Sequence, residues 1–504
     1  MKPVTRIQKK EGLKMKKNLA IFLSSVLLVS TLTSCSSGSS SSSQTASGAT
    51  SGTSSEPVNL TWIMANPGTV PTDNDAMEEK LNALSSDEIG VTVDILYMSS
   101  DEVQLSINAG DYYDIVFTCS WWNNYATQSN KGVFADITDK IQTVTPDLYS
   151  SIPELVWKGS KVNGKLYAVP VYKDTAGSLY WQFNKEVVVD ELGLDYTKYN
   201  TFDSVEEVLE AYKTAYPDKY PINVSRFGIR ALDNEFDILN SSLYIGLDYA
   251  AKDTTVVSVF DDQDYLDRLQ LVHEWFNKGY INPDAPTLND YPTELIVLNQ
   301  QGYPGADAEW SDSYGFDIVS TKYYGPTLTT GSIRGAMNAV NAASNYVDES
   351  LKFMEFVNTN TTARDILAYG VEGTNFEYTS DKTQVNVLNS NYQPWIWAQA
   401  SLYSMTPSAP TTAELIEELK EENDTAAAEA NSQTIGFTFD ITPVEAEVAA
   451  CTTIFDKYMD ELRTGSTDST VEVPKMLAEL ESAGYRTIIA ECQSQLDAYV
   501  AANS

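Results

Sequence analysis

The side chains best suited to binding chemistry in this chain are tryptophans and amides that gather in predicted loops. Residues 118–125 read Thr-Cys-Ser-Trp-Trp-Asn-Asn-Tyr and follow a short apolar run. Two adjacent indoles, Trp121 and Trp122, cannot both point into a core, so we expect at least one to face solvent or a ligand. Indoles stack on flat, weakly polar C–H faces such as those of sugar rings, and amides bind the surrounding hydroxyls. The alternative is one indole packed under the loop and another that only lines the surface.

A second group of candidate binding residues lies around residue 174. Tyr172 and Asp174 follow a Val-Pro turn, and a carboxylate such as that of Asp174 accepts two hydroxyls at once. Trp181 comes next on a predicted strand, where it alternates with Tyr180, so one face of that strand is buried. The sequence leaves open whether Trp181 belongs to the core or to a cleft.

Two later segments add an arginine and two more indoles. Arg334 follows Gly-Ser-Ile, and it either caps a binding site or pairs with one of the many carboxylates. Trp395 and Trp397 alternate around Ile396, so as a strand they share one face and form a large aromatic shelf. The alternative for these two indoles is a contact within the core.

The residues that enzymes and metal sites need are scarce. The chain has one histidine, His273, and its cysteines beyond Cys35 show no metal-ligand spacing. No Gly-x-Ser-x-Gly elbow or phosphate-cradling loop is present, so we predict no catalytic residues, no metal and no cofactor. A glycoside hydrolase is the enzymatic alternative, but 70 acidic residues make any chosen carboxylate pair uninformative. Cys451 and Cys492 fall on apolar helix faces, which predicts buried thiols and leaves a bridge between them open.

The charge of the chain limits its partners. It carries 33 basic and 70 acidic residues, a formal net charge of −37. Such a surface repels phosphate backbones and anionic lipid, so we expect neither nucleic-acid binding nor peripheral membrane binding.

Strands and helices alternate after residue 56. Residues 60–64 and 91–97 alternate in hydrophobicity as strands, a helix is expected over 75–84, and residues 115–117 form a short apolar strand. Strand, helix and strand in this order predict an α/β fold with a largely parallel sheet. Ser204 and Glu207 predict a capping box at the start of a helix. One long helix is expected over 347–369, and two or three more after residue 443.

The amino terminus resembles that of bacterial lipoproteins. Lysines precede an apolar run at 19–32 that is too short to span a bilayer but suits a signal peptide. The run ends in Thr-Ser-Cys at residues 33–35, which resembles a lipobox. The resemblance implies a signal peptide over 1–34, lipid (palmitate) on Cys35, and a protein anchored at the outer face of the cell membrane. Residues 35–56 are rich in Ser and Gly and read as a flexible tether.

Several motifs, in their order and spacing, resemble the extracellular solute-binding proteins of ABC importers, in particular the family 1 sugar-binding type. These motifs are Ala-Gly-Asp-Tyr-Tyr-Asp-Ile-Val at 109–116, Phe-Ala-Asp-Ile-Thr at 134–138, Asn-Gly-Lys-Leu-Tyr-Ala-Val-Pro at 163–170, Phe-Asn-Lys at 183–185 and Met-Asn-Ala-Val at 337–340. The carboxyl-terminal segments 435–440, 462–465, 483–485 and 491–497 resemble the tail of LplA-like lipoproteins. Cys492 departs from that pattern, where a bulky or polar residue is more usual.

The resemblance implies a type II, two-lobed periplasmic-binding-protein-like fold with a hinge and a helical carboxyl-terminal region. The first lobe is expected over 57–172, with a return segment at about 316–370. The second lobe is expected over 173–315, together with about 371–504. A monomer that closes on its ligand and docks on a permease follows from this resemblance.

The resemblance also implies two further site residues. Trp310 follows a run of small residues and matches the aromatic that lines the family's cleft. Glu372 lies in Gly-Val-Glu-Gly, which looks like the subgroup's glycine-flanked glutamate motif, and it either binds ligand or fixes its loop. We therefore predict capture of a carbohydrate, in particular an oligosaccharide, for import without chemical change. A peptide ligand, or a purely structural surface adhesin, is the alternative.

Overall fold

The computed structural model describes residues 56–230, 232–290, 292 and 294–503. Two large hydrophobic clusters divide these residues into two α/β lobes, as the sequence predicts. The expected signal peptide, Cys35 and most of the serine-rich tether lie outside the described residues.

The first lobe is built on a five-stranded sheet with the strand order β2-β1-β3-β11-β4. Its strands are β1 (Val58–Ala65), β2 (Val91–Met98), β3 (Ile115–Thr118), β4 (Ala168–Pro170) and β11 (Met337–Val340). β1 is parallel to β2 and β3, whereas β11 is antiparallel to β3 and β4. The predicted strands at 60–64, 91–97 and 115–117 are therefore confirmed, and they pair in parallel as expected. The sheet as a whole is mixed and not largely parallel, because the return strand β11 pairs antiparallel with both β3 and β4.

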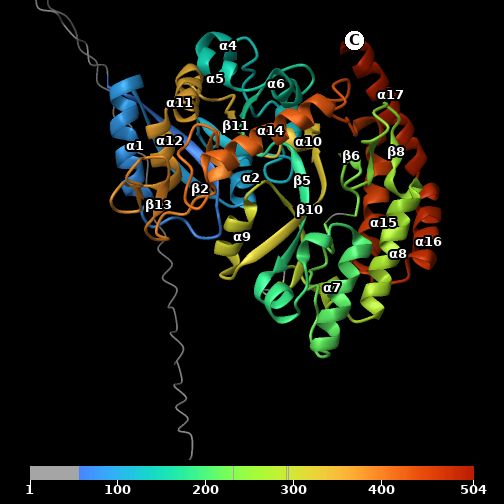
Figure 1. Ribbon diagram of the computed structural model, residues 1–504. Helices are drawn as coiled ribbons and strands as arrows, with labels where there is room; N and C mark the ends of the chain where they lie inside the picture. The colour runs from blue at the N-terminus through green and yellow to red at the C-terminus, as the bar shows by residue number, and fades with distance from the viewer. Residues whose placement is uncertain (1–55, 231, 291, 293, 504) are drawn as a thin grey trace, which may run out of the picture. The chain divides into compact units, whose positions relative to one another are not determined.

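Both faces of this sheet are covered, which explains why its strands are so apolar. The second half of β1 and all of β3 are buried instead of alternating, as is typical of parallel strands with helices on both faces. The helices of this lobe are α1 (Asn74–Ile89), α2 (Ser100–Ala109), α3 (Tyr125–Asn130), α4 (Ile141–Val144), α5 (Pro146–Ser151), α6 (Glu154–Ser160), α10 (Thr330–Ile333), α11 (Val347–Thr359), α12 (Thr361–Tyr369), α13 (Ile396–Gln399) and α14 (Ala413–Glu429). A small hairpin of β12 (Phe376–Tyr378) and β13 (Val385–Val387) follows α12. Figure 1 shows α1, α11 and α12 packed together beside β2.

The helix expected over 347–369 is two helices, α11 and α12. Asn360 separates them, and its side-chain oxygen accepts the backbone N–H of Ala363 at 3.0 Å. An N-cap of this kind satisfies a free N–H at a helix start and stabilises it by about 1 kcal/mol. The prediction missed this break because the apolar periodicity continues through it. Gly370 ends α12, as expected.

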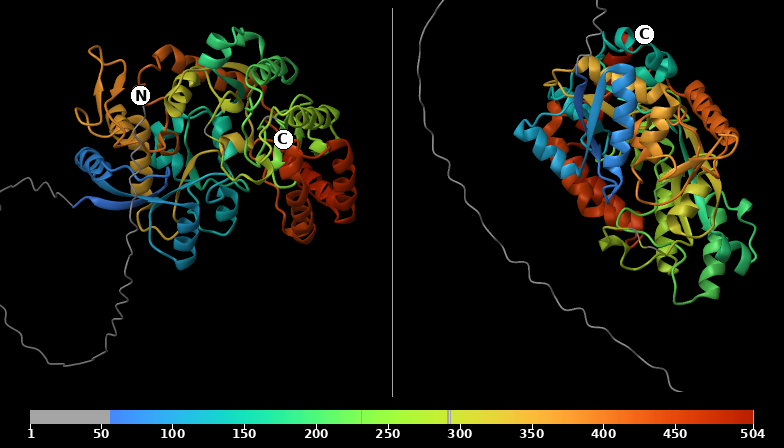
Figure 2. Two further views of the ribbon diagram at one scale, coloured as in Figure 1. Left: turned by 90° about the horizontal axis from the view of Figure 1, so that it is seen from below. Right: turned by 90° about the vertical axis from the view of Figure 1, so that its left-hand side faces the viewer.

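The second lobe is built on two three-stranded sheets. Their orders are β10-β5-β9 and β6-β7-β8, with β5 (Gly177–Asn184), β6 (Phe236–Asn240), β7 (Ile245–Asp248), β8 (Val257–Ser258), β9 (Val297–Gly302) and β10 (Ile318–Thr327). Its α-helices are α7 (Phe202–Ala215), α8 (Gln263–Asn277), α9 (Ala306–Tyr314), α15 (Glu445–Thr464), α16 (Ser469–Ser482) and α17 (Tyr485–Asn503). It also contains the π-helix η1 (Glu186–Glu191) and the short 3-10 helices η2 (Tyr196–Lys198), η3 (Val259–Asp261), η4 (Ala285–Thr287) and η5 (Thr442–Val444). Helices α15 and α16 pack against α8, and α17 packs against both of them; Figure 2 shows these last three helices as red ribbons beside yellow-green ones.

Helix α7 begins three residues earlier than its predicted capping box. Thr201 is the N-cap, and its hydroxyl and that of Ser204 satisfy each other's backbone N–H groups. Ser204 therefore lies within the first turn. The prediction chose the Ser-x-x-Glu pattern, whereas a Thr-x-x-Ser pair one turn earlier makes the same two hydrogen bonds.

The boundaries between the lobes differ from those expected. β10 pairs antiparallel with β5, so the chain returns to the first lobe only after residue 327, and not at about 316. Residues from the segment 371–435, expected in the second lobe, include Tyr392, Ala398 and Ala426 of the first hydrophobic cluster. The carboxyl-terminal helices do belong to the second cluster. Strand pairing and apolar contacts across long sequence separations decide these boundaries.

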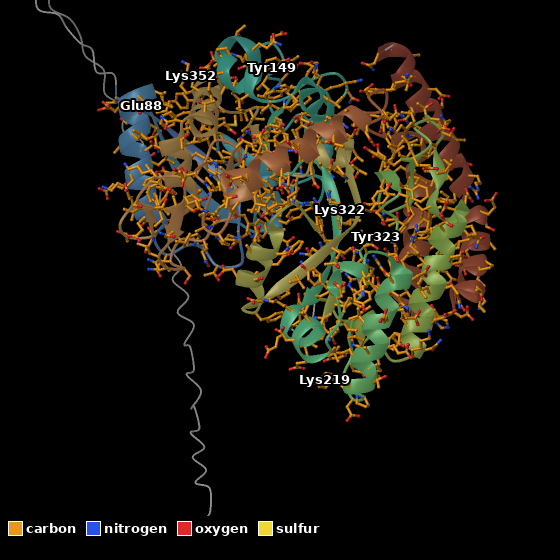
Figure 3. All side chains as sticks on the ribbon, viewed as in Figure 1. Glu88, Tyr149, Lys219, Lys322, Tyr323 and Lys352 are labelled. Atoms are coloured by element: carbon orange, nitrogen blue, oxygen red, sulfur yellow. The ribbon has the colours of Figure 1, made fainter. Side chains whose placement is uncertain are left out.

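Helix α14 contacts both lobes. Asn423 accepts the backbone N–H of Ala176 at 2.7 Å, and Ala426 lies in the first cluster. On another side of the helix, Glu422 forms an ion pair with Lys322 of β10. Figure 3 labels Lys322 and its neighbour Tyr323, which packs against Trp181 and so marks the opposite face of β10.

The three described cysteines are free thiols, and the described helices do not suit a membrane span. Cys119, Cys451 and Cys492 are buried free thiols, so the bridge that the sequence left open is not formed. Within the part of the chain that the structure describes, the helices are too short or too polar to cross a bilayer.

Candidate functional site

The loop after β3 presents one of its two indoles to solvent. The backbone N–H of Trp122 donates to the Cys119 sulfur at 3.1 Å, and Asn123 takes a left-handed conformation with φ 47°. This turn leaves Trp121 59% exposed and buries Trp122, which is 6% exposed and lies 5.4 Å from the Phe117 ring. The expectation that at least one indole faces outward is confirmed. Trp122, however, supports the loop from below and is not a surface for a ligand.

Trp395 and Trp397 stand beside Trp121. Their rings stack with centroids 5.1 Å apart at an interplanar angle of 26°. The centroid of Trp121 lies 6.2 Å from that of each of them. We call these three residues the tryptophan shelf. The segment is not the strand that we predicted, because Trp395 caps the short helix α13, yet the two rings still share a face.

Buried polar side chains hold the shelf in place. The guanidinium of Arg364 on α12 is buried and donates to the carbonyl oxygens of Ile396, Ala400 and Ser401. The amide of Asn338 on β11 donates to the carbonyl oxygens of Ala398 and Gln399. These bonds position the backbone around α13 without a carboxylate partner. Sequence reasoning missed both roles, because Arg364 and Asn338 are distant in the chain from the indoles that they support.

A lysine and a carboxylate lie next to the shelf. Lys173 Nζ is 5.9 Å from the centroid of the Trp397 ring, and Lys173 forms an ion pair with Asp174. Both side chains are only 15% exposed. A cation over an indole face is attracted by the ring quadrupole, so Lys173 links the aromatic and the polar parts of the site. The expected position of Asp174 beside the aromatics is therefore seen, but its partner Lys173 was not predicted.

Tyr172 contributes to the base of the site more than to its surface. It is nearly buried, and its ring centroid lies 4.8 Å from that of Tyr403. The Tyr403 hydroxyl donates to the carbonyl oxygen of Lys173 at 2.9 Å. Burial raises the pKa of Tyr172 to about 12, with a smaller contribution from the charge of Asp424. Tyr403 is a site residue that sequence reasoning missed, since it lies in a polar segment without periodicity.

Trp181 and Trp310 are parts of the second-lobe core. Trp181 is fully buried, with its centroid 5.2 Å from that of Phe202. Trp310 is 8% exposed and packs against Tyr180 and Gly302, where a Cβ atom would lie 2.4 Å from the indole. The prediction that Trp310 lines a cleft is wrong, and for Trp181 the core alternative is the correct one. The hydrophobic patterns of core and cleft indoles are the same in sequence.

Arg334 is a structural clamp. It is buried, and it donates to the carbonyl oxygens of Gly159 at 2.8 Å, Lys161 and Gly436, and to the Thr438 hydroxyl at 2.8 Å. Burial lowers its pKa to about 10, which still leaves it charged at neutral pH. Neither expectation for Arg334, a cap on the site or an ion pair with a carboxylate, is correct. Backbone carbonyl oxygens accept the hydrogen bonds that a carboxylate was expected to accept.

Glu372 is exposed in the turn after α12. The turn is fixed by Asn375, whose side-chain oxygen accepts the backbone N–H of Val371 at 2.9 Å. Gly370 has a φ of 91°, and a Cβ atom there would lie 2.7 Å from that same oxygen. Asn375 and Gly370, and not Glu372, therefore determine the loop, so a contact of Glu372 with ligand stays a prediction.

Two partly open cavities lie in the second lobe, and neither includes the shelf. Two cavities of about 270 and 390 Å³ share Glu294 and Leu295 in the second lobe, and no shelf residue lines either of them. The shelf presents Trp121 to solvent, with 59% of that residue exposed. Among the described residues, no three His, Cys, Asp or Glu side chains are grouped to hold a metal ion.

Comparison with known proteins identifies the family. The model of the family described as bacterial extracellular solute-binding protein matches residues 68–363, and a domain of unknown function, DUF3502, matches residues 433–501. A carbohydrate ABC transporter substrate-binding protein of Streptococcus pneumoniae serotype 4 is 25% identical over 457 residues, which cover 86% of this chain and 89% of that protein.

Solved structures share the fold. The N-glycan transport solute-binding protein NgtS of Streptococcus pneumoniae is 24% identical, with a TM-score of 0.81 over 89% of this chain and 100% of that one. The same protein in complex with Man5GlcNAc gives a TM-score of 0.73 over 89% and 99%. An extracellular solute-binding protein of Bifidobacterium longum subsp. infantis is 16% identical, with a TM-score of 0.63 over 88% and 99%. With the two lobes and the matched span of 68–363, these findings place the chain in the bacterial extracellular solute-binding protein family.

Proposed function

We propose that this protein captures an oligosaccharide on the tryptophan shelf and delivers it, unaltered, to the permease of an ABC importer. The tryptophan shelf is the observation on which this proposal rests. Three indoles from two segments far apart in sequence meet at the carboxyl end of β3, where ligands bind in open parallel sheets. Trp121 keeps most of its surface exposed even though apolar burial would favour covering it.

The chemistry around the shelf suits a sugar. Stacked indoles offer flat apolar faces for the C–H faces of pyranose rings, and Lys173 and Asp174 supply donors and acceptors for hydroxyls beside them. A relative of similar length is named as a carbohydrate ABC transporter substrate-binding protein, and a structural neighbour is recorded in complex with Man5GlcNAc. Both support a carbohydrate ligand over a peptide.

The protein acts outside the cytoplasm, held to the membrane by lipid on Cys35. A binding protein without a confining compartment would diffuse away from its permease, and a tether keeps its effective concentration high. It works as a monomer whose lobes close around ligand. A Cys35→Ala variant should be released into the medium, and a variant that stays firmly in the membrane fraction would contradict the anchor.

A panel screen tests the ligand class. A ligand that binds only the folded state stabilises it, by about 2.7 kcal/mol at a concentration 100 times its Kd, so thermal unfolding in the presence of neutral oligosaccharides should shift upward. The eluted sugar should be chemically unchanged. The shift should disappear in Trp395→Ala/Trp397→Ala.

A matched control separates loss of the site from loss of stability. Phe227 is an exposed ring on the second lobe, so Phe227→Ala should keep the sugar-dependent shift. A shift with peptides and none with sugars would replace carbohydrate by peptide as the ligand. Cleavage of the sugar, abolished by a single carboxylate change, would make the protein a hydrolase.

A further inference from the structure

Helix α14 is fixed to the first lobe along one side. Ala426 lies in the first hydrophobic cluster, and Ala427 packs against that cluster. Asn423, one turn earlier, is buried, and its Nδ2 donates to the hydroxyl oxygen of Tyr403, which also packs against the first cluster. Because apolar burial and hydrogen bonds both hold this side of the helix, we expect α14 to move with the first lobe as one body.

Asn423 also binds the crossover, residues 171–176, which joins β4 of the first lobe to β5 of the second. Its Nδ2 donates to the carbonyl oxygen of Lys173 at 2.7 Å, and its Oδ1 accepts the backbone N–H of Ala176 at 2.7 Å. The Tyr403 hydroxyl donates to the same carbonyl oxygen of Lys173 at 2.9 Å. The backbone of the crossover is therefore held to α14, and the second lobe has to rotate around this segment.

The residue before Asn423, Glu422, connects α14 to the second lobe. The hydroxyl of Ser178 on β5 donates to one of its carboxylate oxygens at 3.1 Å, and the other oxygen forms an ion pair with Lys322 of β10. The Glu422 side chain is 12% exposed and Ser178 is fully buried, so salt and solvent screen these contacts less than those of a surface pair. A residue that moves with the first lobe is thus bonded to two strands of the second.

These contacts belong to an arrangement that leaves the shelf uncovered. Trp121 is 59% exposed, so the second lobe does not enclose it. Lobes that close around a sugar have to rotate about the crossover, and this rotation displaces Ser178 and Lys322 relative to Glu422. Hydrogen bonds span about 2.7–3.2 Å, so a displacement of about 1 Å is enough to break them.

We propose, on the basis of the proposed function, that Glu422 is a latch between the lobes. Its contacts with Ser178 and Lys322 stabilise the arrangement in which the shelf is uncovered, and an oligosaccharide has to release them before the lobes close. A protein whose binding-competent arrangement is only partly populated binds with an apparent affinity that is reduced by that fraction. Removal of the latch therefore raises the affinity, although it removes a stabilising contact from the fold.

Two variants release the latch, one from each lobe. Glu422→Ala removes both contacts from α14, and Lys322→Met removes the ammonium group from β10 while it keeps an apolar stem. The probe sugar is Man5GlcNAc. Calorimetry should give an affinity about five- to tenfold tighter for each variant than for the parent, because a charge-assisted hydrogen bond is lost from the uncovered arrangement alone. The double variant should bind no more tightly than Glu422→Ala, because both changes remove the same ion pair.

Glu417→Ala is the matched control. Glu417 lies on the same helix, and its ion pair with Lys420 joins two residues of α14 instead of two lobes. This variant should bind the probe as tightly as the parent does. None of the variants should unfold at a higher temperature than the parent, which separates release of the latch from a general gain in stability.

X-ray scattering without ligand tests the latch independently of the sugar. The radius of gyration of Glu422→Ala should be smaller than that of the parent and of Glu417→Ala, because released lobes populate the closed arrangement. An affinity that is unchanged or weaker in both latch variants, or a ligand-free radius equal to that of the parent, would overturn the latch and leave carbohydrate capture standing.

The choice of probe does not limit the test. If Man5GlcNAc does not bind, the sugar that gives the largest shift in the panel screen takes its place. Failure of every sugar to bind would overturn carbohydrate capture, and the ligand-free radius of Glu422→Ala would still decide whether Glu422 holds the lobes apart.

Discussion

Two groups of aromatic rings in this protein look alike in their contacts and differ in their exposure. In the first lobe, the three rings of the tryptophan shelf lie within 6.2 Å of one another. In the second lobe, Phe202 is in contact with Trp181, Trp275 and Tyr323, at centroid distances of 5.2 to 5.7 Å. Trp181 and Trp275 are fully buried, whereas Trp121 is largely exposed.

The surroundings of the two groups explain this difference. The second-lobe rings lie between the β10-β5-β9 sheet and helices α7 and α8, which cover them. The indole nitrogens of Trp181 and Trp275 have no hydrogen-bond partner in the structure, so apolar burial outweighs the cost of leaving them unpaired. In the shelf, Trp395 and Trp397 lie at the short helix α13 and are partly buried against the first-lobe core, whereas Trp121 lies on the loop after β3 and stays 59% exposed. Contacts between aromatic rings therefore occur both in a core and at a candidate site. The exposure of a ring to solvent distinguishes the two.

The largest expected effect is on the core group. Trp181→Ala removes a fully buried indole and leaves a cavity, so we expect the free energy of unfolding to fall by about 3–5 kcal/mol. Urea unfolding followed by circular dichroism measures this loss. A loss below about 1 kcal/mol would show that the core relaxes around the missing ring, and the contrast between the two groups would no longer hold.

The second lobe also contains a buried carboxyl group, which makes its stability depend on pH. Asp237 on β6 of the second lobe is buried, and burial raises its pKa to about 7. Because the unfolded carboxyl titrates near 3.9, the folded state holds the proton more tightly between these values. The free energy of unfolding therefore falls as pH rises from about 4 to about 7. Above pH 7 it is about 2–4 kcal/mol lower than at pH 4.

Asp237→Asn should remove this part of the pH dependence. The variant should be more stable than the parent at pH 8 by about 2–4 kcal/mol and equal to it at pH 4. Sugar binding should not follow the same profile, because the pKa of Tyr172 at the site is about 12. Parallel thermal unfolding and binding series from pH 5 to 8 compare the two. A difference in stability that does not change with pH would contradict the burial of a protonated Asp237.

The smallest expected effect is on the shelf. Trp121→Ala removes an exposed ring, so stability should stay within about 0.5 kcal/mol of the parent. Affinity for an oligosaccharide that binds in the panel screen should fall about tenfold, or about 1.4 kcal/mol, because one stacking face is lost. Calorimetry and thermal unfolding on the same sample measure both. A drop in stability as large as that of Trp181→Ala would make Trp121 a core residue.

Much of the fold was predictable from sequence. The alternation around Leu60 and Val93 identified two strands that pair in parallel. The apolar run at 115–117 identified a third strand, which also pairs in parallel with the first. Apolar steps of three and four around Cys451 and Cys492 predicted buried helix faces, which the structure confirms. Local hydrophobic periodicity determines these elements, so a single sequence is enough to find them.

The site was only partly predictable. Trp121, Trp395 and Trp397 were chosen for residue type, and the structure brings them together. Trp310 and Arg334 were chosen in the same way and are buried in structural roles. A candidate residue is informative only after its surroundings are known, because side chains from distant segments decide whether it is covered.

By itself, the sequence determined the α/β class, the family resemblance and the aromatic composition of the candidate loops. Only the tertiary structure decided that Lys173 lies over Trp397, that Tyr403 packs against Tyr172, and that Asn423 of α14 donates to the carbonyl oxygen of Lys173. The physical reason is the range of the interactions. Periodicity and capping act over a few residues, whereas ring contacts and charge act across segments that are hundreds of residues apart in the chain but neighbours in space.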